Sequence, residues 1–198
     1  GRLQARVDYL LYTYGAGAIF AEDKAPSHMD FYNLTVPRLF HLCLLQVEPA
    51  EQVRWLNAFR AMMELSILQP TSALKIDGSA YHHGGHYHSY ARGAFGSLPP
   101  LIRDLSGTPW RLSTEAHERL RRAMLAQRLY ANRLDLPIAL RGRSPFAPGY
   151  GTINPGDIVA LGTLAQCGTP DGAQEVDAEV AAAYLRFLPE KATEQPYV

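Results

Sequence analysis

Residues 50–68, AEQVRWLNAFRAMMELSIL, form a long amphipathic segment that constrains the fold more than any other feature of the chain. Apolar side chains recur there with the spacing of one helical face, at Val53, Leu56, Phe59, Met63 and Ile67. Pro49 precedes the segment and Pro70 follows it, as expected for the first turn of a helix and for the residues just beyond its end. We therefore predict a helix that packs this face into a core.

The same periodicity recurs along the rest of the chain. It predicts helices over residues 2–12, 36–47, 91–105, 115–131, 156–167 and 172–188. Pro37 suits a first turn, Ser113 or Thr114 can cap the helix that follows, and Pro99-Pro100 is expected to interrupt residues 91–105. No segment has the pattern of a strand. The sequence thus predicts an all-α domain of helix pairs joined by irregular loops, an alternation typical of toroids and solenoids.

Composition excludes several classes. The formal net charge is +0, which argues against a nucleic-acid-binding surface over the whole molecule but allows a local anion site. No apolar run approaches the ~18 residues of a membrane span, and the N-terminus lacks the pattern of a signal peptide. Cys43 and Cys167 leave a disulfide and two free thiols equally open.

Residues 75–98 gather histidine, tyrosine and glycine at unusual density. Four histidines and three tyrosines lie close together: His82, His83, His86, His88, Tyr81, Tyr87 and Tyr90. Glycines interrupt the segment, so we expect a loop rather than a buried core element. Loops of this composition are typical of functional sites. The alternative is a surface turn whose aromatic rings pack on a neighbouring element.

Other candidate residues lie outside this segment. Asn33 ends an irregular stretch and is either a ligand-binding group or the cap of the next helix. Arg141 and Arg143 lie in a proline-stiffened loop and are either solvated charges or a bidentate site for a carboxylate or sulfate.

Zinc is an alternative ligand for the histidine-rich segment. His82, His83, His86 and His88 supply enough imidazoles, but their spacing matches no standard zinc-binding pattern. A harder cation such as calcium, held by His82 with carbonyl oxygens, is a weaker alternative. We predict no metal ligands and no required cofactor.

Several segments together resemble one known family. The run from Asp77 to Phe95, D-G-S-A-Y-H-H-G-G-H-Y-H-S-Y-x-x-x-A-F, resembles the catalytic segment of the chondroitin lyases of polysaccharide lyase family 8, in the chondroitin sulfate ABC branch. In that branch the catalytic tyrosine lies seven residues after a histidine, as Tyr90 lies after His83. G-R-S-P-F at 142–146 resembles its G-R-H-P-F, and D-F-Y-N at 30–33 resembles its D-Y-F-N. The chain departs from the family's Asn-Tyr-Pro-Gly at residues 86–89, and Ser144 stands in place of a histidine.

The resemblance implies cleavage of a glycosaminoglycan, chondroitin or dermatan sulfate or hyaluronan, by β-elimination at a 4-linked uronate. Asn33 and His83 would hold the uronate carboxylate, Tyr90 would act as base and then acid, and Arg143 would face the bridging oxygen. Further substrate contacts would come from His82, His86, Tyr87, Arg141 and Trp110.

The resemblance also implies an architecture. Residues 1–198 would be the C-terminal part of an incomplete (α/α) toroid, followed in a longer enzyme by a β-sandwich domain that supplies an acidic residue. The enzyme would be secreted or periplasmic, without nucleic-acid or membrane partners. Two other functions stay open, namely a non-catalytic carbohydrate-binding module and a zinc-dependent hydrolase built on the histidines.

Overall fold

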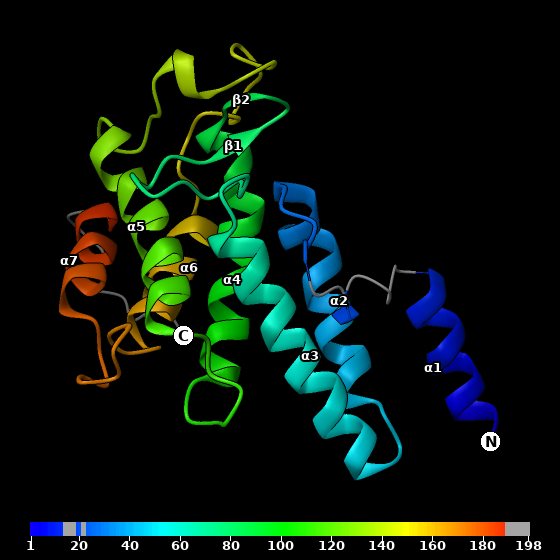
Figure 1. Ribbon diagram of the computed structural model, residues 1–198. Coiled ribbons are helices and arrows are strands. Elements are labelled where there is room, and N and C mark those ends of the chain that lie inside the picture. Colours follow the sequence, from blue (N-terminus) through cyan, green and yellow to red (C-terminus); the bar gives the residue numbers. More distant parts are fainter. Residues whose placement is uncertain (14–18, 21–22, 189–198) are drawn as a thin grey trace.

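The computed structural model describes residues 1–13, 19–20 and 23–188. These residues are mainly helical, which confirms the predicted all-α class; the toroid stays a prediction (Figure 1). The α-helices are α1 (Arg2–Thr13), α2 (Val36–Leu44), α3 (Pro49–Leu68), α4 (His88–Leu105), α5 (Thr114–Tyr130), α6 (Pro155–Ala165) and α7 (Ala178–Phe187). A π-helical turn, η2 (Phe31–Thr35), leads into α2, and a 3-10 turn, η3 (Ile138–Leu140), lies between α5 and α6.

Local capping chemistry explains most helix starts. Ser113 accepts a hydrogen bond from the Ala116 amide and begins α5, as predicted. Asn154 and Asp157 form a reciprocal capping box at the start of α6. Asp177 accepts bonds from the first two free amides of α7, so this helix begins at Ala178 and the prediction of a start at 172 is wrong.

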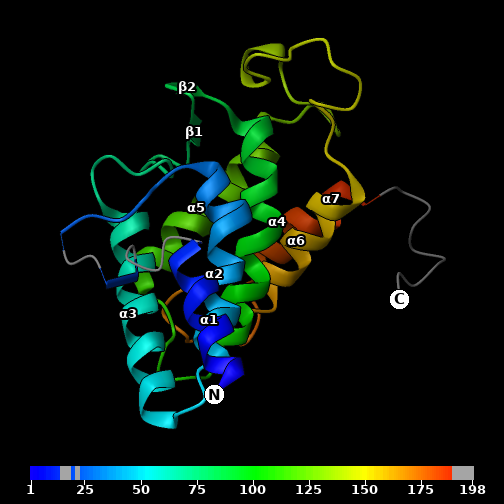
Figure 2. The ribbon, with the colours of Figure 1, turned by 90° about the vertical axis from the view of Figure 1, so that its right-hand side faces the viewer.

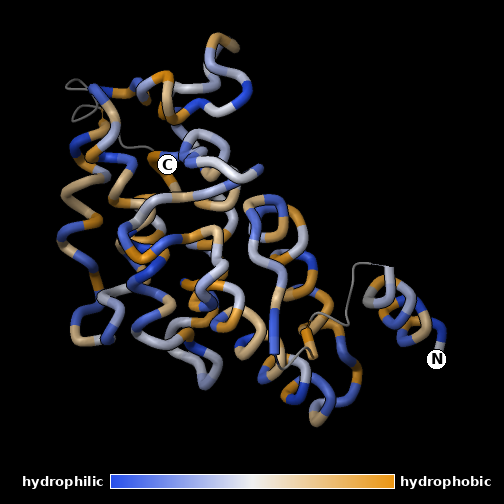
Figure 3. Tube along the Cα trace, turned by 45° about the horizontal axis from the view of Figure 1, so that its top comes forward, coloured by the Kyte–Doolittle hydropathy of each residue, from blue (hydrophilic) through white to orange (hydrophobic). Residues whose placement is uncertain are grey.

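Helices α2 to α7 share one core. α4 packs against α6, α6 against α7, α2 against α3, and α3 against α5. Phe59, Met63 and Ile67 of α3 are fully buried, whereas Val53 is 46% exposed because the first turns of α3 extend beyond the core. α1 makes its helix contacts with α2 at the edge of the fold in Figure 1, and Figure 2 views the molecule from this side, with α1 in front. Apolar and polar residues alternate along the helices, as amphipathic helices around one core require (Figure 3).

Helix α4 is continuous through Pro99 and Pro100, so the predicted interruption is wrong. Each interior proline removes a backbone hydrogen bond at a cost of about 3 kcal/mol. The helix buries an apolar face on both sides of the pair, including Phe95, Leu98 and Ile102, and this burial offsets the cost. The Cys167 thiol, just beyond α6, also donates to the Pro99 carbonyl.

A two-stranded antiparallel hairpin corrects the prediction that the chain has no strand. β1 (Tyr81–His82) pairs with β2 (Gly85–His86). The turn residues His83 and Gly84 both have positive φ, 50° and 77°, as a type I′ hairpin turn requires. The left-handed conformation is uncommon for histidine and costs about 1 kcal/mol or more. His83 keeps this conformation despite its cost because α4 and the core fix both ends of the segment.

Two sequence-level questions are answered by the fold. Cys43 and Cys167 are both buried and both free, so they form no disulfide with each other. No helix among the described residues combines the length and the apolarity that a membrane crossing requires.

Candidate active site

The hairpin, the start of α4 and the loop between α5 and α6 lie at the same end of the molecule (Figures 1 and 2). Tyr90, predicted in a loop, lies in the first turn of α4. The turn η2 packs alongside α4, so Asp30 and Asn33 face this helix from a segment about sixty residues earlier in the chain. A π-helical turn is rare and is found mainly at functional sites.

Tyr90 lies at the centre of this arrangement. Its hydroxyl donates a hydrogen bond of 2.8 Å to Oδ1 of Asp30. The imidazole of His82 stacks on its ring with 4.2 Å between centroids and 13° between planes. The ring of His83, which is exposed at the tip of the hairpin, lies 6.1 Å away. The structure therefore brings His82, His83 and Tyr90 together.

Electrostatics at Tyr90 oppose its ionisation. The hydrogen bond to Asp30 raises the pKa of Tyr90, desolvation raises it further, and Arg143 lowers it. Burial lowers the pKa of His82, with a further lowering from His83, so His82 is neutral at pH 7. Arg143 favours the phenolate, but the hydrogen bond to the Asp30 carboxylate has the larger effect.

Asp30 is the residue of this site that sequence reasoning missed. It appeared only as the first letter of D-F-Y-N, and an aspartate before a helix is usually read as a cap. Asp30 precedes η2 but makes no capping bond through its side chain. Its carboxylate instead bonds Tyr90 through Oδ1, and Oδ2 lies 3.7 Å from Nε2 of His82.

Asn33 does not cap the following helix. It lies within η2, and its Oδ1 accepts a hydrogen bond of 3.1 Å from the Ser97 hydroxyl. Its side chain fills the space beside Gly93 of α4, where a Cβ atom would meet Nδ2 at 2.6 Å. The bond to Ser97 fixes the orientation of the amide, and Nδ2, its donor atom, is the one through which Asn33 would bind an anionic ligand.

The two loop arginines have different environments. Arg141 donates to the carbonyl of Leu136 through Nε and Nη2, at 3.0 and 2.8 Å, and to Pro145 through Nη1. Its guanidinium therefore holds the loop together. Arg143 is exposed and acts electrostatically on Tyr90 and His82. Of the two, Arg143 has the guanidinium that is open to an anion.

Tyr87 joins the hairpin to the arginine loop. It is buried, its hydroxyl lies 2.7 Å from the hydroxyl of Tyr150, and its ring lies against Gly142. Gly142 has φ +54°, and a Cβ atom there would meet the Tyr87 ring at 2.4 Å, so this position requires glycine. This contact fixes the position of the residue just before Arg143.

Several members of the aromatic segment are buried, which corrects the expectation of an open loop. Tyr87, His82 and His88 are all buried, and His86 is half-buried. His86 stacks on Tyr81 and contacts Tyr130 edge-on. His88 lies between Phe95 and Tyr130, and neither of its ring nitrogens has a hydrogen-bond partner within the described part of the chain.

The histidines do not converge on a point. Among the described residues, no three histidine, cysteine, aspartate or glutamate side chains come together in a geometry that could hold a metal ion. The described residues therefore offer no side-chain cluster of the kind that the zinc hypothesis requires.

Burial of His88 predicts acid sensitivity. Desolvation lowers the pKa of His88 from 6.5 to about 3. Below pH 6.5 His88 binds a proton in the unfolded chain but not in the native state. The free energy of unfolding therefore falls by about 1.4 kcal/mol for each unit by which the pH is lowered. The free energy of unfolding, measured by chemical denaturation, should fall less between pH 7 and pH 5 in His88→Leu than in the wild type. Phe95→Leu, a change in a ring that touches His88, should keep the full loss; equal losses in all three proteins would contradict this account.

Trp110 lies apart from these groups. It follows the far end of α4, an 18-residue helix about 27 Å long, and its Nε1 donates to Asn57 at 2.9 Å.

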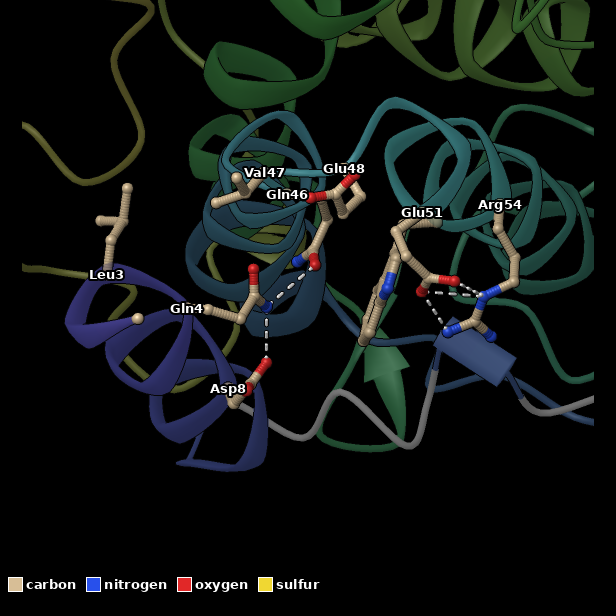
Figure 4. Close-up of a pocket in the computed structure, with 10 residues that line it drawn as sticks. Leu3, Gln4, Asp8, Gln46, Val47, Glu48, Glu51 and Arg54 are labelled. Carbon is tan, nitrogen blue, oxygen red and sulfur yellow. Dashed lines mark hydrogen bonds and ion pairs between the residues drawn. The ribbon is translucent and has the colours of Figure 1, made fainter.

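A cleft also opens away from Tyr90, between α1 and the start of α3 (Figure 4). Asp8, Glu48 and Glu51 line that cleft, and Glu51 pairs with Arg54. Its acidic lining does not suit a polyanionic ligand.

Residues 1–194 match the family model described as "Lyase, catalytic", and the chain belongs to this family. Within it, the chain falls in the polysaccharide lyase branch of the chondroitin sulfate ABC lyases. It is 32% identical over 183 residues to the chondroitin sulfate ABC exolyase of Proteus vulgaris, covering 90% of this chain and 18% of that protein. The exolyase of Bacteroides thetaiotaomicron is 32% identical over 165 residues, covering 81% and 16%. The chain thus spans less than a fifth of the length of these curated relatives.

Proposed function

We propose that this chain carries the base, the carboxylate-binding groups and the arginine of a glycosaminoglycan lyase. The observation that supports the proposal is the packing of three separate segments around the start of α4: the hairpin segment with His83 and Tyr90, the turn η2 with Asn33, whose side chain lies against Gly93, and the loop with Arg143, whose charge acts on Tyr90. The relatives named above are chondroitin sulfate ABC exolyases, which supports a chondroitin sulfate polymer as the substrate; cleavage at a 4-linked uronate is part of the proposal.

Each residue has a distinct task in this proposal. The proton on C5 of a uronate is barely acidic while the neighbouring carboxylate is negative, so donors must stabilise the enolate-like charge that develops. Asn33 Nδ2 and the exposed imidazole of His83 donate to that carboxylate. Tyr90 removes the proton, and Arg143 faces the bridging oxygen.

The remaining predictions belong to the same proposal. The chain is the C-terminal part of a helical toroid in a longer secreted or periplasmic enzyme, and a following β-sandwich domain supplies a further acidic group. His82 and Tyr87 support Tyr90 and the arginine loop through the contacts described above, and His86 serves as a more distant substrate contact. Trp110, which lies beyond the other end of α4, is left out of the proposal.

The direct test is to mix the protein with chondroitin sulfate, dermatan sulfate or hyaluronan and to follow the ultraviolet absorbance of the unsaturated uronate. Rising absorbance establishes elimination. Product from a longer chain but not from these 198 residues would assign the missing group to the additional domain. If neither the longer chain nor these 198 residues give product, the lyase function is contradicted. Polysaccharide binding without product would support the binding module instead.

The role of Asn33 can be tested without changing a polar side chain, by a substitution at the glycine of α4 that Asn33 contacts. Gly93→Ala places a Cβ atom where Asn33 Nδ2 now lies, so the side chain must move away from its bond with Ser97. Because one misplaced donor to a developing charge costs about 10²-fold or more, we expect turnover to fall by at least about tenfold. Gly96→Ala is the control, since nothing lies within 4 Å of its Cβ position. Equal turnover in the two variants would remove Asn33 from the mechanism.

A further inference from the structure

The contact between Asp30 and Tyr90 is a built feature of the fold. Asp30 is held at the start of η2, which packs on α4, and Tyr90 lies in the first turn of α4. The stacked His82 ring restricts the Tyr90 ring to one orientation. The hydroxyl is thus directed at Oδ1 of Asp30, at 2.8 Å, by three elements at once.

The surroundings of the Tyr90 hydroxyl contain both signs of charge. The groups that face it come from every packed element: Asp30 before η2, His82 and His83 of the hairpin, Tyr87 before α4, and Arg143 and Tyr150 of the loop after α5. Asp30 is the carboxylate among them. Its Oδ1 lies 2.8 Å from the Tyr90 hydroxyl oxygen, and Asp30 is the only one of these groups bonded to the hydroxyl among the described contacts.

This arrangement conflicts with a mechanism in which Tyr90 waits as a free phenolate. The carboxylate stabilises the protonated phenol by accepting its proton in a hydrogen bond, and it repels the phenolate. At pH 7 a phenol with a pKa of about 10 is already ionised in only about one molecule in a thousand. If Tyr90 had to lose its proton to water first, it would therefore seldom be in the phenolate form that can act as a base.

We propose that Asp30 is a further catalytic residue, which accepts the hydroxyl proton of Tyr90 as Tyr90 accepts the C5 proton of the uronate. This inference rests on the proposed lyase function and assigns a role to a residue that the resemblance did not supply. Tyr90 then acts as a two-way proton carrier and never needs to exist as a free phenolate.

The step balances. The C5–H bond breaks as a new O–H bond forms at Tyr90, and the original hydroxyl proton moves to Oδ1 of Asp30. The electron pair of the C5–H bond becomes the C4=C5 double bond, and the C4–O bond breaks with its pair on the leaving oxygen. Tyr90 protonates that oxygen, and Asp30 returns its proton to Tyr90. No net proton is consumed, and Asp30 ends as a carboxylate.

Asp30→Asn separates this proposal from its alternatives. The amide oxygen still accepts the Tyr90 bond, so the geometry is kept while the basicity is lost. We expect turnover at pH 7 to fall by about 10²-fold or more, with KM nearly unchanged, and to recover about tenfold per pH unit at alkaline pH as the phenolate forms. If Asp30 only held Tyr90 protonated, its loss would increase turnover at pH 7. An unchanged or faster variant therefore overturns the proposal.

A second readout does not depend on activity. With 13Cζ-labelled tyrosine and Tyr90→Phe for assignment, the titration of Tyr90 should shift to lower pH in Asp30→Asn, because the carboxylate that raises the pKa is gone. An unshifted titration shows that the contact is absent and overturns the proposal. Asp77→Asn, which keeps its turn bonds to Ser79 through the amide oxygen, is the control for losing one carboxylate nearby. Absence of product from every wild-type form refutes the lyase function itself, which the titration distinguishes from failure of the Asp30 contact.

Discussion

Tyr90→Phe is expected to reduce product formation from chondroitin sulfate by at least about a thousandfold. The substitution removes one oxygen atom, and that oxygen is the group proposed both to remove the C5 proton and to protonate the leaving oxygen. Acid–base catalysis at one step contributes about 10²- to 10⁴-fold, and here one side chain serves two steps. Initial rates from ultraviolet absorbance measure the loss, with substrate affinity measured separately.

The fold should survive this change. The Tyr90 ring keeps its stacking on His82 and its contact with Tyr87, and only the bond to Asp30 is lost. Tyr81→Phe is the matched control, because Tyr81 lies in the same segment and its half-exposed ring stacks on His86 instead. If both variants retained turnover within about threefold of the wild type, Tyr90 would not be the base. If both lost it, the effect would come from the segment rather than from the Tyr90 oxygen.

Arg92→Met is expected to lower the free energy of unfolding by about 3–5 kcal/mol. Arg92 lies on α4 with a largely buried side chain and pairs with the buried carboxylate of Asp157 at 3.1 Å. It also donates to backbone carbonyls of Ser89 and of the loop before α6, among them Tyr150 at 3.1 Å and Thr152. Its loss leaves a buried carboxylate uncompensated and several carbonyls unpaired, which are the costliest outcomes for a polar substitution.

This variant connects stability to the site. Arg92 ties the loop that contains Arg143 and Tyr150 to α4, two residues after Tyr90, so amide exchange at residues 149–152 should accelerate. Arg103→Met, at an exposed arginine of the same helix paired with Asp104, should change stability by less than about 1 kcal/mol. Adding Asp157→Asn to Arg92→Met should restore part of the loss, because the unpaired charge is removed while an amide oxygen can still accept the capping bond from the Asn154 amide. Denaturant unfolding that placed the two arginine variants at equal stability would contradict the assignment.

Local sequence patterns predicted the helices well where the decisive interactions are local. The amphipathic segment of α3 and the cap at Ser113 involve residues within a few positions of one another, so periodicity and capping rules identify them. The hairpin was missed because a type I′ turn usually carries Asn-Gly or a similar pair, and here His83 occupies the first position. The continuous α4 was missed because its burial against α6 outweighs two prolines.

The candidate site was predicted in part. Motif spacing selected Tyr90, His83, Arg143 and Asn33, which the fold brings to one end of the molecule. It also named Arg141 as a further substrate contact, and only the folded loop shows that the Arg141 guanidinium is engaged by the carbonyls of Leu136 and Pro145. Trp110 is an aromatic residue like those of the site, yet α4 carries it to the opposite end of the molecule.

The sequence by itself therefore determined the helical class, most helix boundaries and the family, because these depend on short-range periodicity, capping and motif spacing. Only the tertiary structure decided which groups touch. The bond between Asp30 and Tyr90 joins residues 60 positions apart, and the burial that keeps His88 neutral comes from the packing of α4 and α5. Proton affinities depend on such through-space neighbours and on desolvation, and neither is encoded in the local order of residues.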